Sequence, residues 1–350
     1  MTVRIVRAGG DARGRGRAVG TALADLIHPS LEFYRRAFRR RGLGPDDLPR
    51  VLGPYRAAAR AELPRLVEEL EGTAEGAGVS PWELFAVNAF EEIETLADRA
   101  PAGRADRCMA FAVSGPDGTV LAHNEQWYAA DRGMTAVVVA RPDDGPAFAS
   151  PTVATCLPAV GMNAAGTAQA IMSLTARDDG VGIPRVVVSR SSLQARDPVE
   201  AVARALPPRR AGGYAHLVAF PGGRRFTVET SATGHAVVEG PAHTNHYLDP
   251  ALAARSPEPG PGSLGRLHRV AELIEERSPA SPEESMEVLR DHDGPGQPIC
   301  LHADPAQGDE AEAVIFAVVC HLEERRMWVA PGYPCETPFE EIDLREAFAP

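Results

Sequence analysis

The sequence predicts an α+β protein in which a helical segment precedes a core of strands and helices. From about Arg13 to Arg99, apolar residues recur three and four positions apart, which is the period of packed helices. After about residue 107 the period becomes that of strands, and strands and helices then follow without regular alternation. We therefore divide the chain into a helical N-terminal segment, 1–107, and a core, 108–350.

One helix start in the first segment is clearly marked. The run Ser80-Pro81-Trp82-Glu83 offers an N-cap hydroxyl, a proline at the first helical position and a capping-box glutamate. We expect this helix to continue through Phe90 and Ile93. Asn88 and the acidic residues 91–94 are interpreted as solvated or capping groups.

The core is expected to open with a β-hairpin. Two apolar stretches, Met109–Ser114 and Thr119–Asn124, are separated by Asp117-Gly118, a dipeptide typical of tight hairpin turns. Residues 134–140 and 167–173 have the composition of further strands. Cys108 therefore stands at the change from helical to strand-like sequence.

Later elements follow from local signals. Asp197-Pro198-Val199-Glu200 predicts a capped helix start, and the proline- and glycine-rich residues 256–263 predict an exposed loop. Gly260 to Gly265 matches the dinucleotide fingerprint only formally, because no strand precedes it. The remaining expected elements are strands at 214–220 and 225–230, helices at 264–277 and 282–290, and a closing strand pair at 313–321 and 327–330.

The composition excludes several classes of function. A net charge of −12 argues against nucleic acid or an anionic membrane as the main partner, since both require clustered positive charge. A small-molecule substrate is favoured. All 36 basic residues are arginine, which excludes lysine Schiff bases and Walker phosphate loops.

The cysteines predict neither disulfides nor a metal site. Five are present, widely spaced and without a Cys-x-x-Cys pair, which is typical of a reducing compartment. His243 and His246 are three apart, but no third ligand has convincing spacing, so we expect no metal. With no signal-like N-terminus and no run of about 20 apolar residues, we expect a cytoplasmic protein.

Several motifs together resemble a known family. They are Glu69 to Gly78, Asn88 to Ile93, Cys108, Asp117 to Glu125, Gly161-Met162-Asn163 and His243-Thr244-Asn245-His246. In this order and spacing they resemble the acyl-coenzyme A:6-aminopenicillanic acid acyltransferase-like (isopenicillin N acyltransferase-like) cysteine Ntn hydrolases, where Ntn denotes an N-terminal nucleophile. The resemblance implies a four-layer αββα sandwich. It also implies a precursor that cleaves itself at Arg107-Cys108 into α and β chains.

The resemblance also implies roles for individual residues. Cys108 would be the nucleophile, with its new α-amino group as base. Asn245 would direct its amide to the carbonyl oxygen under attack, Asn163 would offer its backbone N–H in the substrate pocket, and His243 would bind substrate. The implied reaction passes an acyl group from a small-molecule amide, or from acyl-coenzyme A as co-substrate, through a thioester on Cys108 to water or an amine acceptor. No other cofactor is implied.

The sequence departs from the family pattern in three respects. Gln126 occupies the place of a usual aspartate that would hold the new α-amino group, and Glu125 is expected to point to the opposite face of its strand. Arg107 stands where glycine is common, and Met109-Ala110 replaces small hydroxylated residues. These departures leave open an alternative, an uncleaved and catalytically weakened relative that binds an acylated metabolite or a partner protein.

Overall fold

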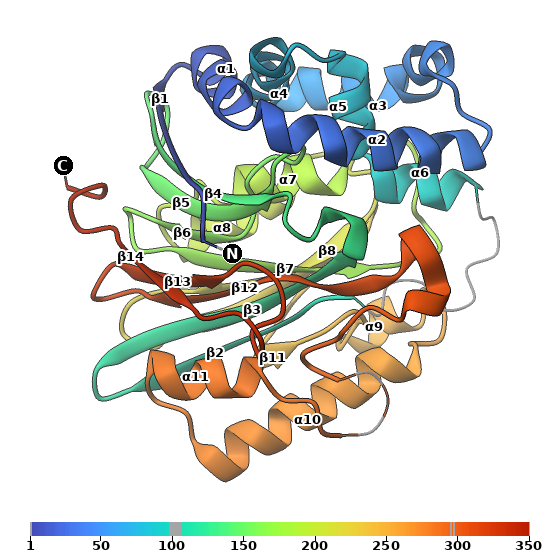
Figure 1. The fold of residues 1–350 in the computed structure, drawn as a ribbon. Helices are drawn as coiled ribbons and strands as arrows, with labels where there is room; N and C mark the ends of the chain where they lie inside the picture. The colour runs from blue at the N-terminus through green and yellow to red at the C-terminus, as the bar shows by residue number, and fades with distance from the viewer. Residues whose placement is uncertain (1, 98–106, 295, 297, 350) are drawn as a thin grey trace.

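The two sheets of this protein are stacked face to face between two layers of helices (Figure 1). A computed structural model describes residues 2–97, 107–294, 296 and 298–349. One sheet has eight strands and the other has six. The predicted α+β class and αββα layering are confirmed.

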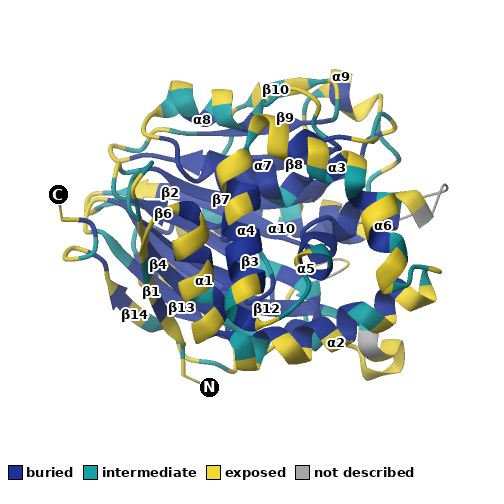
Figure 2. Cartoon of the chain, turned by 90° about the horizontal axis from the view of Figure 1, so that it is seen from above, coloured by how far each residue is buried: buried dark blue, intermediate teal, exposed yellow. Residues whose placement is uncertain are grey.

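The N-terminal helices cover the outer face of the eight-stranded sheet (Figure 1). In the view from above, buried residues on these helices alternate with exposed ones, as expected for helices packed on one side (Figure 2). Before them, β1 joins the same sheet by pairing parallel to β4, so the segment 1–107 and the core share a sheet. The elements are β1 (Ile5–Gly10), α1 (Ala12–Ala22), α2 (Ala24–Arg40), α3 (Leu48–Glu62), α4 (Pro64–Ala77), α5 (Pro81–Val87) and α6 (Phe90–Ala97).

Helices α1 and α4 pack with their backbones in contact (Figure 1 and Figure 2). A Cβ on Gly16 would lie 2.0 Å from the carbonyl oxygen of Glu69, and one on Gly72 would lie 2.1 Å from a backbone oxygen of α1. The Glu69 carboxylate is buried between Arg15 at 2.7 Å and Arg190 of α7 (Arg185–Ser192) at 3.1 Å. Glycines and a buried ion triad therefore fix this crossing.

The single helix expected from Ser80 through Ile93 is in fact two helices, α5 and α6. The chain breaks at Asn88, whose fully buried amide donates to the Thr155 carbonyl at 2.9 Å and accepts from Leu157 N–H at 2.8 Å. Ser80 makes no capping hydrogen bond with its side chain. The break is therefore determined by residues almost 70 positions away along the chain.

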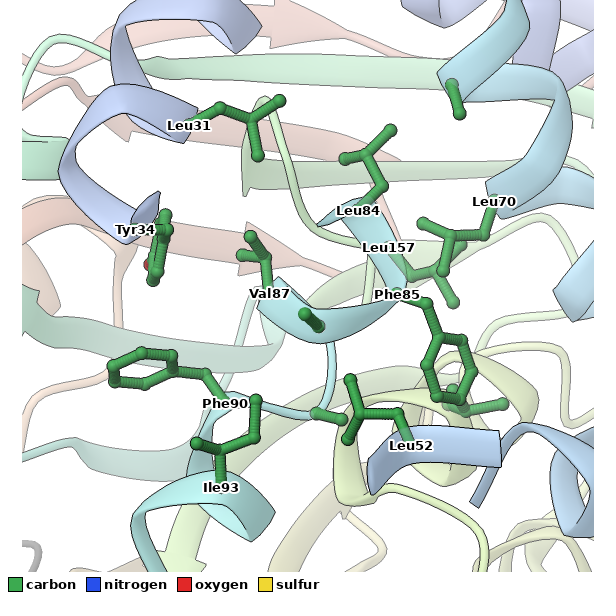
Figure 3. Packing of buried hydrophobic residues seen from close by; sticks show 14 of the residues in the cluster. Leu31, Tyr34, Leu52, Leu70, Leu84, Phe85, Val87, Phe90, Ile93 and Leu157 are labelled. Atoms are coloured by element: carbon green, nitrogen blue, oxygen red, sulfur yellow. The ribbon is translucent and has the colours of Figure 1, made fainter. Parts of the chain in front are cut away.

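The acidic residues of α6 are buried, which corrects the prediction that they are solvated. Glu91, Glu92 and Glu94 are 8%, 3% and 5% exposed. Around them lies the core formed by α2 to α6, in which Tyr34 and Phe90 meet edge to face (Figure 3). This acidic stretch consequently points into the protein.

The eight-stranded sheet has the order β1-β4-β5-β6-β7-β8-β9-β10, and the six-stranded sheet β11-β2-β3-β12-β13-β14. The strands predicted from the sequence are confirmed to within two residues, apart from β3, which extends to Tyr128. The strands after β1 are β2 (Met109–Gly115), β3 (Gly118–Tyr128), β4 (Thr135–Pro142), β5 (Phe148–Val153), β6 (Gly161–Asn163), β7 (Ala168–Leu174), β8 (Gly213–Ala219), β9 (Arg225–Thr230), β10 (His235–Val238), β11 (Ala242–His243), β12 (Glu312–His321), β13 (Arg326–Ala330) and β14 (Glu340–Asp343).

The register around β2 positions the candidate site. Gly115 pairs with Gly118 across the predicted Asp-Gly turn, and Ala110 pairs with His123 on β3. On its other side Ala110 pairs with His243 of β11. Cys108 precedes Ala110 by two residues and shares its face, which belongs to the apolar core between the two sheets.

Two helices, α10 (Pro261–Arg277) and α11 (Pro282–Leu289), cover the outer face of the six-stranded sheet (Figure 1). Helix α10 begins three residues earlier than predicted, so residues 261–263 are helical. The predicted start of α8 (Pro198–Ala205) is confirmed, since Asp197 accepts from Glu200 N–H at 2.8 Å. In the part of the chain that the structure describes, no helix has the length and apolarity needed to cross a bilayer.

Candidate active site

Cys108 lies at the head of β2 with its thiol buried. Its side chain is 5% exposed, and Sγ lies 3.4 Å from Oε1 of Glu125 and 3.6 Å from the backbone oxygen of Gln126. Burial, followed by the Glu125 carboxylate, raises the pKa of the Cys108 thiol well above its usual range. The thiol is therefore protonated at neutral pH, and Glu125 is placed to accept its proton.

Glu125 has two neighbours at this site. While Oε1 faces the thiol, Oε2 lies 3.0 Å from Nε2 of His123, two residues earlier on β3 and fully buried. The two side chains share a face because strand residues two apart point the same way. His123 consequently holds the carboxylate against Cys108.

The side chain of Gln126 points away from the thiol, which reverses the expected arrangement. Gln126 is fully buried on the face toward α11, where its Nε2 donates to the carbonyl of Ile299 at 3.0 Å. Only its backbone oxygen faces Cys108. The prediction that Glu125 is the residue pointing elsewhere is wrong, because the register places Glu125 on the same face as Cys108.

Arg107 is anchored beside the bond that the sequence predicts to be cleaved. Its guanidinium lies 2.7 Å from Glu312 and 3.4 Å from Glu94, and it donates to the Tyr128 hydroxyl at 3.2 Å. It also stacks over the Trp127 ring, 4.2 Å from the centroid. These contacts fix the residue before Cys108, whereas the preceding residues 98–106 lie outside the described structure.

Asn245 lies on the β11 flank of β2, two residues after His243. Its Nδ2 donates to the carbonyl of Ser173 in the other sheet at 3.1 Å, and Oδ1 accepts from Arg266 at 2.9 Å. Asn245 also lines a pocket with about 520 Å³ of empty space, distinct from the one beside Glu125. Glu125 and Asn245 thus flank β2 on opposite sides.

Asn163 and His243 form hydrogen bonds with protein groups other than the Cys108 thiol. The Asn163 side chain donates to two backbone carbonyls of residues 193–195, at 2.8 and 2.7 Å, and its backbone N–H donates to Thr167 at 2.9 Å. His243 is fully buried, with Nε2 2.7 Å from Glu229. The Asn245 amide, the Asn163 backbone N–H and the His243 imidazole, which were expected to act on substrate, thus each have a hydrogen-bond partner within the protein.

The side chains of His243 and His246, three residues apart in the sequence, face different partners in the described structure. Nε2 of His243 faces Glu229, whereas Nδ1 of His246 lies 2.7 Å from the Ser263 hydroxyl. Neither histidine belongs to a group of three or more metal-ligating side chains among the residues described.

A pocket with about 630 Å³ of empty space lies beside Glu125. Its walls are mainly apolar and come from α5, α6 and both sheets, and they include Val87 and Phe90. Two of its carboxylates have partners, since Glu91 accepts from the Tyr214 hydroxyl and Glu92 lies 2.8 Å from Arg185. Glu125 thus connects this pocket to the thiol of Cys108.

Fold and site together define an αββα protein with a buried cysteine at the head of a central strand. The chain belongs to the acyl-coenzyme A:6-aminopenicillanic acid acyl-transferase family, whose family model matches residues 113–335. The family inferred from the motifs is confirmed. Because the match begins after Cys108, the role of this cysteine depends on the site geometry.

Solved structures of similar fold include two single-residue variants of conjugated bile acid hydrolase from Clostridium perfringens. They are 12% and 13% identical to this chain, with TM-scores of 0.46 and 0.43, over 68% of this chain and 93% of theirs. Penicillin V acylase from Agrobacterium tumefaciens is 12% identical, with a TM-score of 0.40, over 68% and 86%. No protein of curated function matches the sequence.

Proposed function

We propose that this chain is an autoprocessing cysteine Ntn amidohydrolase or N-acyltransferase whose nucleophile is Cys108. The observation that carries the proposal is the Glu125 carboxylate 3.4 Å from the Cys108 thiol, at the head of a strand and beside a pocket. A nucleophile next to a base that is itself held by a third group is the usual arrangement for covalent acyl transfer. Here the third group is His123.

The first reaction is cleavage of the Arg107-Cys108 bond. Glu125 accepts the proton of Sγ, and the sulfur attacks the carbonyl carbon of Arg107. As the C–N bond breaks, the Cys108 nitrogen takes a proton and a thioester remains. Water hydrolyses the thioester, which leaves a carboxylate on Arg107 and a free thiol and α-amino group on Cys108.

The anchoring of Arg107 favours this cleavage. Glu94 and Glu312 hold the guanidinium, so the scissile carbonyl has little freedom to move away from the sulfur. Positioning of reacting atoms is worth several orders of magnitude in rate. Side-chain contacts therefore fix Arg107 at the position where glycine is common in the family.

Catalysis on substrate then uses the new N-terminus. The α-amino group has a reference pKa of about 7.7 to 8.0, so it exchanges a proton with the thiol near neutral pH. Glu125, rather than Gln126, supplies the carboxylate beside that amine. The Asn245 amide, released from Ser173, donates to the developing oxyanion. The buried hydrogen bonds of Asn163 and His243 hold β6 and β11 in position.

The apolar pocket suits an apolar acyl group. Phe90, Trp127 and Ile171 line it, and Glu125 connects it to the thiol. The family description names acyl-coenzyme A as donor and 6-aminopenicillanic acid as acceptor, so we propose an acyl thioester or small amide as donor and an amine or water as acceptor.

The test is formation of an acyl-enzyme. Full-length protein is incubated with a medium-chain acyl-coenzyme A, with and without 6-aminopenicillanic acid, and the mass of each chain is measured beside Cys108→Ala and Cys320→Ala, which alters a cysteine of β12 that does not line the pocket. We expect one acyl adduct on wild type and Cys320→Ala, mapped to Cys108, and none on Cys108→Ala. Cleaved protein that forms an adduct only at another residue contradicts the proposal.

One observation favours a second candidate, a binding protein that stays uncut. The raised pKa keeps the Cys108 thiol protonated in the uncut chain, and this disfavours attack of the sulfur on the Arg107 carbonyl. The pocket beside Glu125 would then hold an acylated metabolite. This candidate predicts a single intact chain, with equal ligand affinity for wild type and Cys108→Ala.

A further inference from the structure

We propose that His292, Cys300, His302 and Cys335 bind one zinc ion in a closed, structural site. One ligand atom from each lies within 4.8 Å of the others. The two sulfurs are 3.5 Å apart, and Nε2 of His302 lies 3.1 Å from Sγ of Cys335. Around tetrahedral zinc, with Zn–S of about 2.3 Å and Zn–N of about 2.0 Å, sulfurs lie about 3.8 Å apart and sulfur and nitrogen about 3.5 Å.

The backbone that carries these ligands is held at several points. Cys300 N–H donates to Asp291 at 2.9 Å, and the carbonyl of the next residue, Leu301, accepts from Val314 of β12 at 2.9 Å. Cys335 lies in a turn in which two backbone N–H groups donate to Tyr333. The ligand set therefore joins the segment after α11 to the turn after β13.

His302 has the surroundings of a metal ligand. Its ring is stacked on Tyr333, with centroids 3.9 Å apart and an interplanar angle of 11°. While Nε2 faces Cys335, Nδ1 lies 3.7 Å from a carboxylate oxygen of Glu336. Metal-bound histidines generally direct their second nitrogen to a carboxylate or carbonyl, which fixes the tautomer and orients the ring.

The geometry favours a metal over a disulfide. A bond between Cys300 and Cys335 would require the sulfurs to approach to about 2.05 Å, and it would give no reason for two imidazoles to converge on them. Two thiolates and two imidazoles are a ligand set typical of structural zinc. These four residues are widely spaced in the sequence, so no metal site was predicted there. The fold brings their side chains together.

The site lies next to β3, on the face opposite the Glu125 side chain. The carbonyl of Ile299, next to Cys300, accepts from the side chains of Asn124 and Gln126 on β3, each at 3.0 Å. Zinc bound at Cys300 would hold this carbonyl in place. The metal would thereby stabilise the outer face of β3 without contacting substrate.

The test is the zinc content of the full-length protein, purified without chelators from zinc-supplemented cells and measured by elemental mass spectrometry. We expect about one zinc per chain in wild type, and below about 0.1 in Cys335→Ser and His302→Ala. The matched controls are Cys156→Ser and His268→Ala, which alter a cysteine and a histidine outside the cluster and should retain zinc. Metal-free wild type would overturn the proposal, as would zinc retained in both cluster variants.

A second measurement uses only wild-type protein, so it tests the site even if the cluster variants fail to fold. Wild-type protein stripped of metal is titrated with Co²⁺, and tetrahedral thiolate coordination gives an intense ligand-field and charge-transfer spectrum at one equivalent. Thiol counting on unreduced, unfolded protein distinguishes the disulfide, because five cysteines less the two joined would leave three free thiols. Three thiols and no cobalt spectrum would assign a disulfide and refute the metal site. Since Cys108→Ala should also bind zinc, failure here is separable from failure of the proposed enzyme.

Discussion

The carboxylate of Glu125 bridges the thiol of Cys108 and the imidazole of His123, with contacts of 3.4 Å and 3.0 Å. The pKa of the thiol is raised by burial and by this carboxylate, so sulfur in the uncut chain remains protonated until a base removes the proton. Glu125 is that base in the proposed cleavage, and four substitutions test this arrangement and the fold around it.

Glu125→Gln should slow cleavage of the Arg107-Cys108 bond by roughly 10²- to 10⁴-fold, the usual contribution of a positioned general base. The amide keeps the size of the side chain but cannot accept the thiol proton at neutral pH. The measurement is the fraction of cut chain over time after purification at low temperature. Glu276→Gln, which neutralises an exposed carboxylate on α10, is the control and should cleave at the wild-type rate.

Gln126→Leu should leave cleavage intact but lower the free energy of unfolding by about 1 to 2 kcal/mol, because a buried hydrogen bond to Ile299 is lost. Denaturant unfolding and the cleavage assay are run on the same preparation. Slow cleavage without a loss of stability would mean that the Gln126 side chain acts on the thiol directly. That result would contradict its position against Ile299, on the opposite face of β3 from Cys108.

Asp131→Asn should change the pH dependence of stability. Burial raises the pKa of Asp131 to about 6, against hydrogen bonds from Ser30 and Tyr34, both at 2.6 Å. Because the folded pKa lies above the unfolded one, the stabilisation is present at acidic pH and is lost as the pH rises through about 6. Asparagine mimics the protonated acid at every pH.

The stability of Asp131→Asn relative to wild type should therefore rise by about 2 kcal/mol from about pH 4.5 to about pH 7.5. Urea unfolding at a series of pH values measures this difference. A difference that does not vary with pH would show that Asp131 is ionised throughout this range.

Gly72→Ala should destabilise the protein by several kcal/mol, since the added methyl meets the backbone of α1 at 2.1 Å and the helices must separate. Gly53→Ala on α3 is the matched control, with no atom within 4 Å of its added Cβ, and should stabilise by about 0.5 to 1 kcal/mol. Thermal unfolding of both variants distinguishes close packing from helix propensity. Equal effects would contradict the close crossing of α1 and α4.

Elements with local signals could be predicted from the sequence. Asp117-Gly118 specifies its own turn, and Asp197 caps α8 within a single turn of helix. The break at Asn88 could not be predicted, because its hydrogen-bond partners, Thr155 and Leu157, come from a distant segment. The edge strand β1 depends similarly on pairing with β4, more than a hundred residues later.

The candidate site was only partly predictable. Cys108 follows from its position at the change of period, but the choice between Glu125 and Gln126 depends on register. That signal was present in the sequence, since a turn pairing Gly115 with Gly118 places Cys108 opposite Glu125 when the register is continued. By contrast, Cys300 and Cys335 meet only because the fold brings two separate connections together.

The most direct test of the account is the intact mass of purified wild-type protein beside Cys108→Ala. The account predicts two fragments in the wild type, of 107 and 243 residues, that meet at Arg107-Cys108, and a single chain of 350 residues in the variant. A wild type that remains uncut after prolonged incubation, or a Cys108→Ala variant that is cut at the same bond, would contradict the self-processing nucleophile.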